Sequence, residues 1–510
     1  MTSLVAAVLL AGCRARAPVP APELQILEGE DRRSSAEAVP RTSAIFDGKA
    51  VRLRAARGET LGFTVWQRHP QPLRATLGSP LVRLRGFTVD HVRVTRPSTA
   101  MYGGGRGAGR YPDGLTPADA PSSDPSYFEL EVTRDAAPGR YAGGLQVGER
   151  AVPLELTVED VLLPQVGDAP LVWAYYDPRE LAWQHGLPVD ADETFALEER
   201  CAAMFREHGV LATPELTPAE WPRRHELVRG ASFVPVLLPE TDAALDEAAR
   251  FWSSVLADGD RWAFAIPIDE PRDDARRREV LALARRVRAV RQRTGAERLL
   301  LAVTDEPRPV YEDAVDIFVS PSAISRIPPR NRAARARRWT YNGRPPLAGS
   351  MVVDAADLDL RTWGWIAWRW DVPLWYVWDA LYWHDRHNAR RAKLARPGRP
   401  LDPSADAVSF DDGTDHGNLD GVLALPGDRA RPCRPTLRLK ALRRGLYERL
   451  LLEAASCTPA ARAAADALAK TLVPVALADA RGTRATAPKS AAAWSAARTQ
   501  LLELASACRR

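Results

Sequence analysis

Two adjacent carboxylates, Asp269 and Glu270, end the apolar run 262–268 and are followed at once by Pro271. Neighbours on a regular strand point to opposite faces, so both acids can share a pocket only where the strand gives way to a loop, and a proline makes that break. Adjacent carboxyls influence each other's ionisation, which can leave one protonated and one charged. The sequence therefore predicts a pair of catalytic carboxyls suited to proton transfer.

The Asp-Glu dipeptide recurs in the chain, so the context of each pair matters. Three further pairs occur, Asp192-Glu193, Asp246-Glu247 and Asp305-Glu306. The first two lie in helix-like stretches. The third follows a strand-like run, 299–303, and also precedes a proline, so the pattern leaves it open. The surroundings of Asp269 and Glu270 favour them as the catalytic pair.

Apolar runs of strand length alternate with helix-like stretches from about residue 168 onward. Eight such runs occur, at 171–176, 210–213, 233–238, 262–268, 299–303, 315–319, 339–341 and 373–378. This alternation predicts a parallel sheet, and eight units predict a (β/α)8 TIM-like barrel over 168–430. The acid pair then lies at the carboxyl end of the fourth strand, where catalytic groups of such barrels lie.

The regions on either side of the predicted barrel have different patterns. Residues 42–164 alternate short strands with turn signals, at 51–55, 60–66, 91–95, 127–132, 141–147 and 152–158, which predicts an antiparallel β-sandwich. Residues 431–510 are rich in Ala and Leu and predict a C-terminal helical extension. The expected fold is therefore multidomain: a sandwich, a barrel and a helical region.

The N-terminus predicts export. Residues 3–13 form a short apolar segment ending in Leu-Ala-Gly-Cys, which resembles the lipobox of bacterial lipoproteins. We expect a signal peptide over 1–13, lipidation of Cys13 that anchors the protein to the membrane of the cell envelope, and a Pro-, Ala- and Arg-rich tether over 14–41. The alternative is a cytoplasmic protein with an apolar tip.

The five cysteines lack the spacing of a zinc site. Cys201 lies in a helical pattern and is expected in the core. Cys433, Cys457 and Cys508 lie in the C-terminal part, and export would favour a disulfide such as Cys457–Cys508. The sequence does not fix the pairing.

Tryptophan is concentrated near the end of the predicted barrel, where seven of the 15 lie between Trp363 and Trp383. Indole faces pack on the C–H faces of sugars, so aromatic side chains beside carboxylates suit a saccharide pocket. Trp365, Trp368 and Trp375 are expected in the core. Trp378 and Trp383, at and beyond the end of the eighth strand, are expected to contact substrate.

No cofactor, metal or nucleic acid is expected. His384, Asp385 and His387, and the acidic loop 411–416, lack convincing ligand spacing, and the loop lacks the glutamate that closes a helix-loop-helix calcium site. The net charge of +5 is small for 510 residues, and the arginines lie on helix faces such as 272–293, which disfavours nucleic-acid binding.

The motifs of the chain, in their order and spacing, resemble glycoside hydrolase family 123 over about residues 50 to 450. Those in the sandwich are ARGE (56–59), RYPDGLTP (110–117), PGRYAG (138–143) and LTVEDVLLP (156–164). Those in the barrel are IDEP (268–271), VDIFVSP (315–321), WTYN (339–342) and the run 361–383. Beyond it, DGVLALPG (420–427) and RLKALRRGLYE (438–448) match the family's closing strand and helix.

This resemblance implies a retaining β-N-acetylgalactosaminidase that uses the 2-acetamido group of its substrate as the nucleophile. Glu270 would protonate the leaving oxygen and then activate water. Asp269 would hold the acetamido N–H and stabilise the oxazoline-like intermediate. Tyr341 would contact the sugar or its acetamido group.

Two other readings compete with this one. A non-catalytic glycan-binding envelope lipoprotein could retain the barrel as a scaffold. A glycosidase acting on sugars without an acetamido group would need a separate carboxylate nucleophile, for which Asp177, Glu215 and Asp305 lie at predicted strand ends.

Overall fold

The computed structural model describes residues 23–509 apart from 30, 36, 258, 312–313, 322–337, 385–401 and 481–489. Cys13, the predicted signal peptide 1–13 and residues 14–22 of the predicted tether lie outside the described residues, as do Asp385 and His387.

Two sheets share one hydrophobic core in the N-terminal part. The first has the order β1-β3-β7-β5-β6, with bounds Leu24–Glu28, Thr60–Gln67, Ser126–Val132, Val82–Val94 and Gly109–Pro117. The second has the order β2-β9-β8-β4, with bounds Val51–Arg57, Arg150–Leu162, Gly139–Val147 and Leu73–Leu77. Stacking of Phe63 on Phe128, with ring centroids 5.5 Å apart, contributes to this core. The predicted sandwich is confirmed in its main outline.

The structure corrects two expectations in this region. The segment 14–41 was expected to be a tether, but its residues Leu24–Glu28 form β1, a fully buried strand that pairs antiparallel with β3. The sandwich was expected to be antiparallel, but β2 and β9 pair in parallel. Strands β4 and β6 were not predicted. In β6, glycine and proline within 109–117 obscure the alternation.

All eight strands predicted for the next region occur, in one parallel sheet of order β11-β10-β17-β16-β15-β14-β13-β12. Their bounds in chain order are Val172–Ala174, Val210–Ala212, Phe233–Pro235, Trp262–Ala265, Leu299–Val303, Ile317–Val319, Arg338–Tyr341 and Trp375–Val377. The sheet curls until the segments after β11 and β12 meet at a parallel bridge between Leu216 and Val236. All carboxyl ends therefore face the same side.

The helices that connect these strands differ in length. They are α1 (Arg179–His185), α2 (Asp192–Arg206), α3 (Trp221–Arg224), α4 (Asp242–Val255), α5 (Asp274–Thr294) and α7 (Thr362–Trp370). Between β14 and β15 the described residues contain a single 3-10 turn, Pro309–Tyr311, and most of the connection from β15 to β16 is not described. The prediction of eight strand–helix units is thus confirmed for the strands and not for a complete ring of helices.

Aromatic side chains fill the inside of the curled sheet. Phe264 and Trp339 lie edge to face, with ring centroids 4.9 Å apart, and Phe264 meets Trp173 at the same separation. Tyr376 stacks on Trp173 with centroids 4.5 Å apart. Residues two apart on a strand share a face, so Tyr341 lies above Trp339 on β16. The rings form a rigid apolar floor below the carboxyl ends of the strands.

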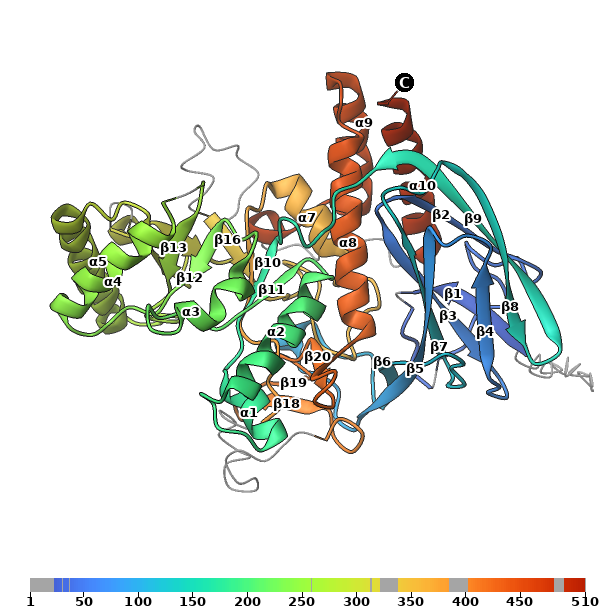
Figure 1. Cartoon of the computed structure of the whole chain (residues 1–510), viewed down its shortest axis with the longest axis horizontal. Coiled ribbons are helices and arrows are strands. Elements are labelled where there is room, and N and C mark those ends of the chain that lie inside the picture. The colour runs from blue at the N-terminus through green and yellow to red at the C-terminus, as the bar shows by residue number, and fades with distance from the viewer. Residues whose placement is uncertain are drawn as a thin grey trace, which may run out of the picture.

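Two hairpins and three helices follow the sheet. The hairpins are β18–β19 (Val408–Asp411 and His416–Asn418) and β20–β21 (Ala424–Pro426 and Cys433–Pro435), and the helices are α8 (Leu437–Ala454), α9 (Pro459–Leu472) and α10 (Ala491–Ala507). The C-terminal helical prediction is confirmed for these elements. Helix α8 runs between the sandwich and the parallel sheet (Figure 1) and packs on α7, β6 and β3. It touches α7 backbone to backbone at Gly364 and Gly445.

Helix α8 is buried although it carries several charged side chains, because each charge meets an opposite one. Arg438 forms a two-pronged pair with Asp113 of β6, with its Nη2 2.9 Å from Oδ2. Its Nη1 also donates to the carbonyl oxygen of Met351 at 2.7 Å. Glu448 pairs with Arg361, the N-cap residue of α7. Arg438 therefore ties the sandwich to the segment that follows β16.

Glu129 of β7 is the acidic centre of a second buried cluster. Its carboxylate accepts from Lys440 Nζ at 2.6 Å, from Arg85 Nη2 at 2.6 Å and from Arg443. Burial alone would raise the pKa of Glu129, but Arg443, Lys440 and Arg85 together hold it well below its usual range. The carboxylate is therefore charged in the folded protein.

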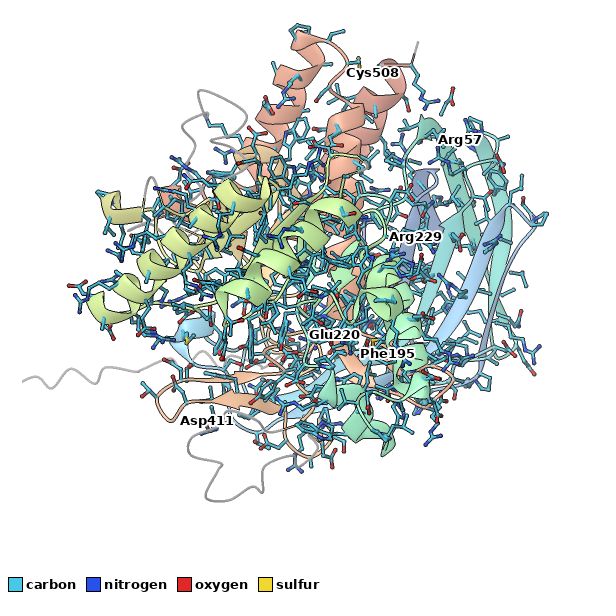
Figure 2. The ribbon with its side chains drawn as sticks, turned by 60° about the vertical axis from the view of Figure 1, so that its left-hand side comes forward. Arg57, Phe195, Glu220, Arg229, Asp411 and Cys508 are labelled. Atoms are coloured by element: carbon cyan, nitrogen blue, oxygen red, sulfur yellow. A yellow bond between two sulfur atoms is a disulfide. The ribbon has the colours of Figure 1, made fainter. Side chains whose placement is uncertain are left out.

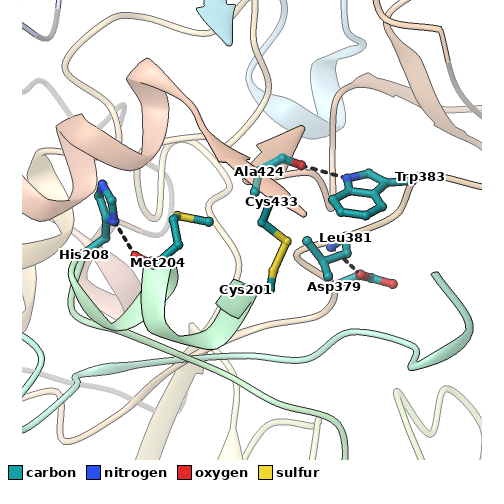
Figure 3. The surroundings of a disulfide bond; sticks show 8 residues. All are labelled: Cys201, Met204, His208, Asp379, Leu381, Trp383, Ala424 and Cys433. Atoms are coloured by element: carbon teal, nitrogen blue, oxygen red, sulfur yellow. Dashed lines mark hydrogen bonds between the residues drawn. A yellow bond between two sulfur atoms is a disulfide. The ribbon is translucent and has the colours of Figure 1, made fainter. Parts of the chain in front are cut away.

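Two disulfides connect distant segments. Cys201 of α2 pairs with Cys433 of β21, with Cα atoms 5.2 Å apart (Figure 3), so the expected core residue is also a bridge. Cys457 pairs with Cys508 at the end of α10 (Figure 2), which is one of the pairings that the sequence left open. Among the described residues, no helix combines the length and apolar character needed to cross a bilayer.

We predict that Glu129→Gln lowers the free energy of unfolding by about 3–5 kcal/mol, because three cations would lose their buried counter-charge. Glu131→Gln on the same strand is the matched control. Glu131 pairs at 3.3 Å with Arg83, whose side chain is 68% exposed, so its loss should cost less than about 1 kcal/mol. Urea denaturation followed by circular dichroism measures both, and equal losses would contradict this account of the α8 interface.

Candidate active site

Asp269 and Glu270 follow β13 at the carboxyl edge of the parallel sheet, as predicted. The backbone of Glu270 is in the left-handed region, with φ of 37°. Its N–H donates to the Oγ1 of Thr304 at 2.6 Å, and that hydroxyl donates to Asp269 Oδ1 at 2.7 Å. Thr304, directly after β14, therefore holds the two acids together.

Both oxygens of Glu270 have donors. The hydroxyl of Tyr341, at the end of β16, donates to Oε1 at 2.8 Å. Arg272 Nη2 lies 2.6 Å from Oε2, and the Arg272 side chain is 84% exposed. The predicted Tyr341 thus contacts one of the acids directly.

Burial raises the pKa of Asp269, although part of the residue reaches solvent. The charge of Glu270 raises it further, while the hydrogen bond from Thr304 opposes the shift. Burial and the Glu270 carboxylate raise the pKa of Tyr341 far above its usual range, so this hydroxyl remains a donor at physiological pH. The site thus has an acid with raised pKa beside a carboxyl that is fully hydrogen-bonded.

A third carboxyl approaches the pair. Of the three strand-end acids considered as separate nucleophiles, Asp177 pairs with Arg179 and Asp305 pairs with Arg308 at 3.1 Å. Glu215, after β11, instead faces Asp269 and accepts a hydrogen bond from the N–H of Ile266. Its pKa is raised to about 7 by burial and by the charge of Asp269.

Aromatic side chains line the same edge. Tyr376 of β17 lies between Trp173 and Tyr341, at 4.5 and 6.3 Å between ring centroids. Burial raises its pKa well above the usual range, and Asp269, Glu215 and Asp379 add to the shift. The Tyr376 hydroxyl is therefore a donor within the field of three carboxyls.

The two tryptophans predicted to contact substrate lie in different surroundings. Trp378 is partly exposed, and its backbone N–H donates to Oδ1 of Asn342, the neighbour of Tyr341, at 3.0 Å. Its ring packs beside Tyr382 and Phe410.

Trp383 is 2% exposed, and its indole N–H donates to the carbonyl of Ala424 at 2.8 Å (Figure 3). The expected sugar contact of Trp383 is therefore corrected to a core position. An alternating pattern could not reveal this, because β20 covers the ring. Trp365, Trp368 and Trp375 are buried, as predicted.

Those residues considered for metal binding that the structure describes have other partners. His384 Nδ1 lies 2.6 Å from the buried carboxylate of Glu180. In the acidic loop, Asp411 pairs with Arg96 at 2.7 Å, and Asp412 accepts from the backbone of its own turn. The part of the chain that is described contains no group of three potential metal ligands.

Sequence reasoning missed the roles of Thr304, Tyr376 and Arg272. Thr304 and Tyr376 lie at the ends of predicted strands, and that position is the one signal that could have identified them. Arg272 lies two residues beyond Glu270 in a segment that was interpreted as a solvated helix face. Helix α5 begins only at Asp274, after the N-cap Asp273, which frees Arg272 for the acid.

Comparison with known proteins gives one informative result. No family model and no curated protein match the chain. Among solved structures it is similar to a family 123 glycoside hydrolase from Clostridium perfringens, described as acting in glycolipid glycan hydrolysis. The TM-score is 0.60 at 10% identity, over 95% of this chain and 98% of that chain. The chain has the fold of that enzyme.

Two further solved structures resemble the chain only weakly, as their low TM-scores show. A β-glucuronidase from Faecalibacterium prausnitzii gives 0.29 at 10% identity, over 78% of this chain and 65% of that chain. A putative α-galactosidase from Bacteroides fragilis gives 0.22 at 11% identity, over 64% and 72%. At these identities the comparisons establish the fold alone.

We predict that Glu270→Gly is more stable than Glu270→Ala by about 1 kcal/mol, because a Cβ is unfavourable at this left-handed φ. Comparing these two variants cancels the loss of the carboxylate. The order should reverse at Glu279, on the exposed face of helix α5, where Gly is less stable than Ala by about 1 kcal/mol. Urea denaturation of the four variants measures both differences, and the same sign at both positions would show that Glu270 is unstrained.

Proposed function

We propose that the protein is a glycoside hydrolase, specifically a retaining β-N-acetylhexosaminidase of the galactosaminidase type that works by substrate-assisted catalysis. The observation that carries the proposal is the joining of Asp269 and Glu270 through the Thr304 hydroxyl, with Tyr341 on Glu270. Their place at the carboxyl edge of a curled parallel sheet supports a barrel-type active site. The fold shared with a family 123 glycoside hydrolase supports the same class.

In the first step, Asp269 accepts a hydrogen bond from the acetamido N–H. This contact turns the carbonyl oxygen of the acetamido group toward the anomeric carbon. The bond between that oxygen and the anomeric carbon forms as the glycosidic bond breaks. Glu270, in its protonated form, gives its proton to the leaving oxygen. The Thr304 hydrogen bond and the positive charge that develops on the acetamido group both oppose the rise that burial gives to the pKa of Asp269, so Asp269 is ionised and stabilises that charge.

In the second step, ionised Glu270 takes a proton from water, which attacks the anomeric carbon and opens the oxazoline ring. Two inversions give net retention. Tyr341 donates to Glu270 at 2.8 Å and can stabilise the carboxylate formed in the first step. Arg272, on the other oxygen, is exposed enough to move away when the acid must be protonated.

Substrate assistance explains why adjacent acids are sufficient. In a two-carboxylate retaining enzyme, the nucleophile stands about 5 Å from the acid, on the other side of the anomeric carbon. The Thr304 hydroxyl instead binds the Asp269 carboxylate and the backbone N–H of Glu270, which holds these two neighbouring residues on one side of the site. Asp269 reaches an acetamido group more readily than it reaches the far side of the anomeric carbon.

The aromatic surfaces and the location fit the same proposal. Tyr341 offers a ring face for a sugar, and the partly exposed Trp378 stands at the same edge of the sheet. We propose that the protein faces the periplasm or the exterior of a bacterial envelope, lipid-anchored through Cys13. The disulfides Cys201–Cys433 and Cys457–Cys508 support export, because disulfides persist in oxidising compartments.

We expect the purified protein to hydrolyse aryl β-hexosides that carry a 2-acetamido group and to leave plain β-hexosides intact. Asp269→Asn and Glu270→Gln should each lower kcat/KM by about 10²–10⁴-fold, because each removes a group required for charge or proton transfer. Glu306→Gln, in the other Asp-Glu-Pro segment, is the matched control. Its kcat/KM should stay close to that of the unmodified protein.

Colorimetric release from N-acetylgalactosaminides and N-acetylglucosaminides also gives the epimer preference. Hydrolysis of plain hexosides would place the nucleophile elsewhere. A folded protein that releases no product but binds N-acetylhexosamines would favour the non-catalytic glycan-binding lipoprotein.

A further inference from the structure

Glu215 is fixed by backbone hydrogen bonds on both sides at the place where the parallel sheet closes. Thr213 donates its N–H to the carbonyl of Ala174 at 3.1 Å, and Leu216 donates to that of Pro235 at 3.0 Å. Leu216 is fully buried, and neighbours in an extended segment point to opposite faces. The Glu215 side chain therefore points to the face opposite Leu216, where it meets the segment after β13.

The groups around Glu215 come from three elements. Ile266, after β13, donates its N–H to the carboxyl, and Asp269, three residues on, faces it. Tyr376 of β17 lies in the field of Glu215, Asp269 and Asp379, with Tyr175 beside it. Glu270 and its partner Arg272 lie beyond Asp269.

Glu215 differs from the other strand-end acids in having no cationic partner among the described residues. Asp177 is paired with Arg179, and Asp305 with Arg277 and Arg308. Burying a carboxylate without a counter-charge is costly, so such a group holds its proton to higher pH. This behaviour agrees with the pKa of about 7 that burial and Asp269 give to Glu215.

We propose that Glu215 is a substrate-positioning residue, whose carboxyl forms a hydrogen bond with a hydroxyl of the sugar held beside Asp269. This inference rests on the proposed function. The neutral carboxyl leaves Asp269 as the charged group that faces the acetamido substituent, which its role as charge stabiliser requires. A third carboxyl without a counter-charge also favours uncharged sugars over acidic ones at this position.

The direction of the pH effect follows from the raised pKa. Below about pH 7 Glu215 is protonated and donates, whereas above it a second negative charge appears beside Asp269 and the donor is lost. Productive binding should therefore weaken as the pH rises through about 7. Glutamine keeps the donor and cannot ionise, so Glu215→Gln should remove this alkaline loss.

The test measures kcat and KM between pH 5 and 9 on the best acetamido substrate, for the unmodified protein, Glu215→Gln, Glu215→Ala and Glu199→Gln, an exposed control on α2. We expect Glu215→Ala to raise KM about tenfold with a smaller change in kcat. At pH 6 the KM of Glu215→Gln should stay within about threefold of that of the unmodified protein. Its substrate binding should not weaken at alkaline pH as that of the unmodified protein does. Melting temperatures identify variants that do not fold. If Glu215→Ala does not fold, Glu215→Gln, whose side chain has the same shape as Glu, still tests the pH effect.

Two results would overturn the inference. One is an unchanged KM in Glu215→Ala together with the same loss of binding at alkaline pH in Glu215→Gln as in the unmodified protein. This result would show that Glu215 does not contact the substrate. Loss of turnover in Glu215→Gln as complete as in Glu270→Gln would instead make its charge essential, as for a nucleophile. The failure of the proposed function looks different. In that case Glu270→Gln would match the unmodified protein in kcat/KM, or a folded unmodified protein would release no product from any acetamido substrate.

Discussion

The buried ion pairs of helix α8 are the interactions on which the arrangement of the molecule depends. Arg438 is 1% exposed, pairs with Asp113 of the sandwich, and donates to the carbonyl of Met351 beyond β16. Without its partner, such a charge is strongly destabilising inside a protein. The helix can therefore be buried only when the sandwich and the parallel sheet hold it from both sides. That requirement fixes the two parts relative to each other and supports the β16 edge that carries Tyr341.

At the site, one hydroxyl has a comparable organising role. Thr304 accepts from the backbone of Glu270 and donates to the side chain of Asp269, which keeps the two acids on one wall although they are neighbours in sequence. The cost is a left-handed backbone at Glu270. Strain of this kind persists where surrounding contacts determine the geometry, and it is common at functional sites. The aromatic floor of Trp173, Phe264 and Trp339 supplies the rigid support.

The sequence predicted those features that depend on local pattern. Most of the eight parallel strands are buried on both faces and form apolar runs, and Asp269 and Glu270 are found just after one such run ends. The contacts of Thr304, Tyr376 and Glu215 join segments distant in the chain, and no local spacing encodes them. Strand β1 was missed because a Pro-, Ala- and Arg-rich segment precedes it, and its pairing with β3 decides its structure. Trp383 was misplaced for the same reason, since β20 covers it.

The most direct test of the central claim uses substrates in which only the proposed nucleophile changes. We would compare kcat/KM for aryl β-N-acetylhexosaminides whose acetamido methyl carries no, one, two or three fluorine atoms. Fluorine withdraws electrons from the acetamido oxygen and weakens it as a nucleophile. If that oxygen attacks the anomeric carbon, kcat/KM falls steeply with each fluorine. A rate that is independent of fluorination would contradict substrate-assisted catalysis and place the nucleophile on the protein.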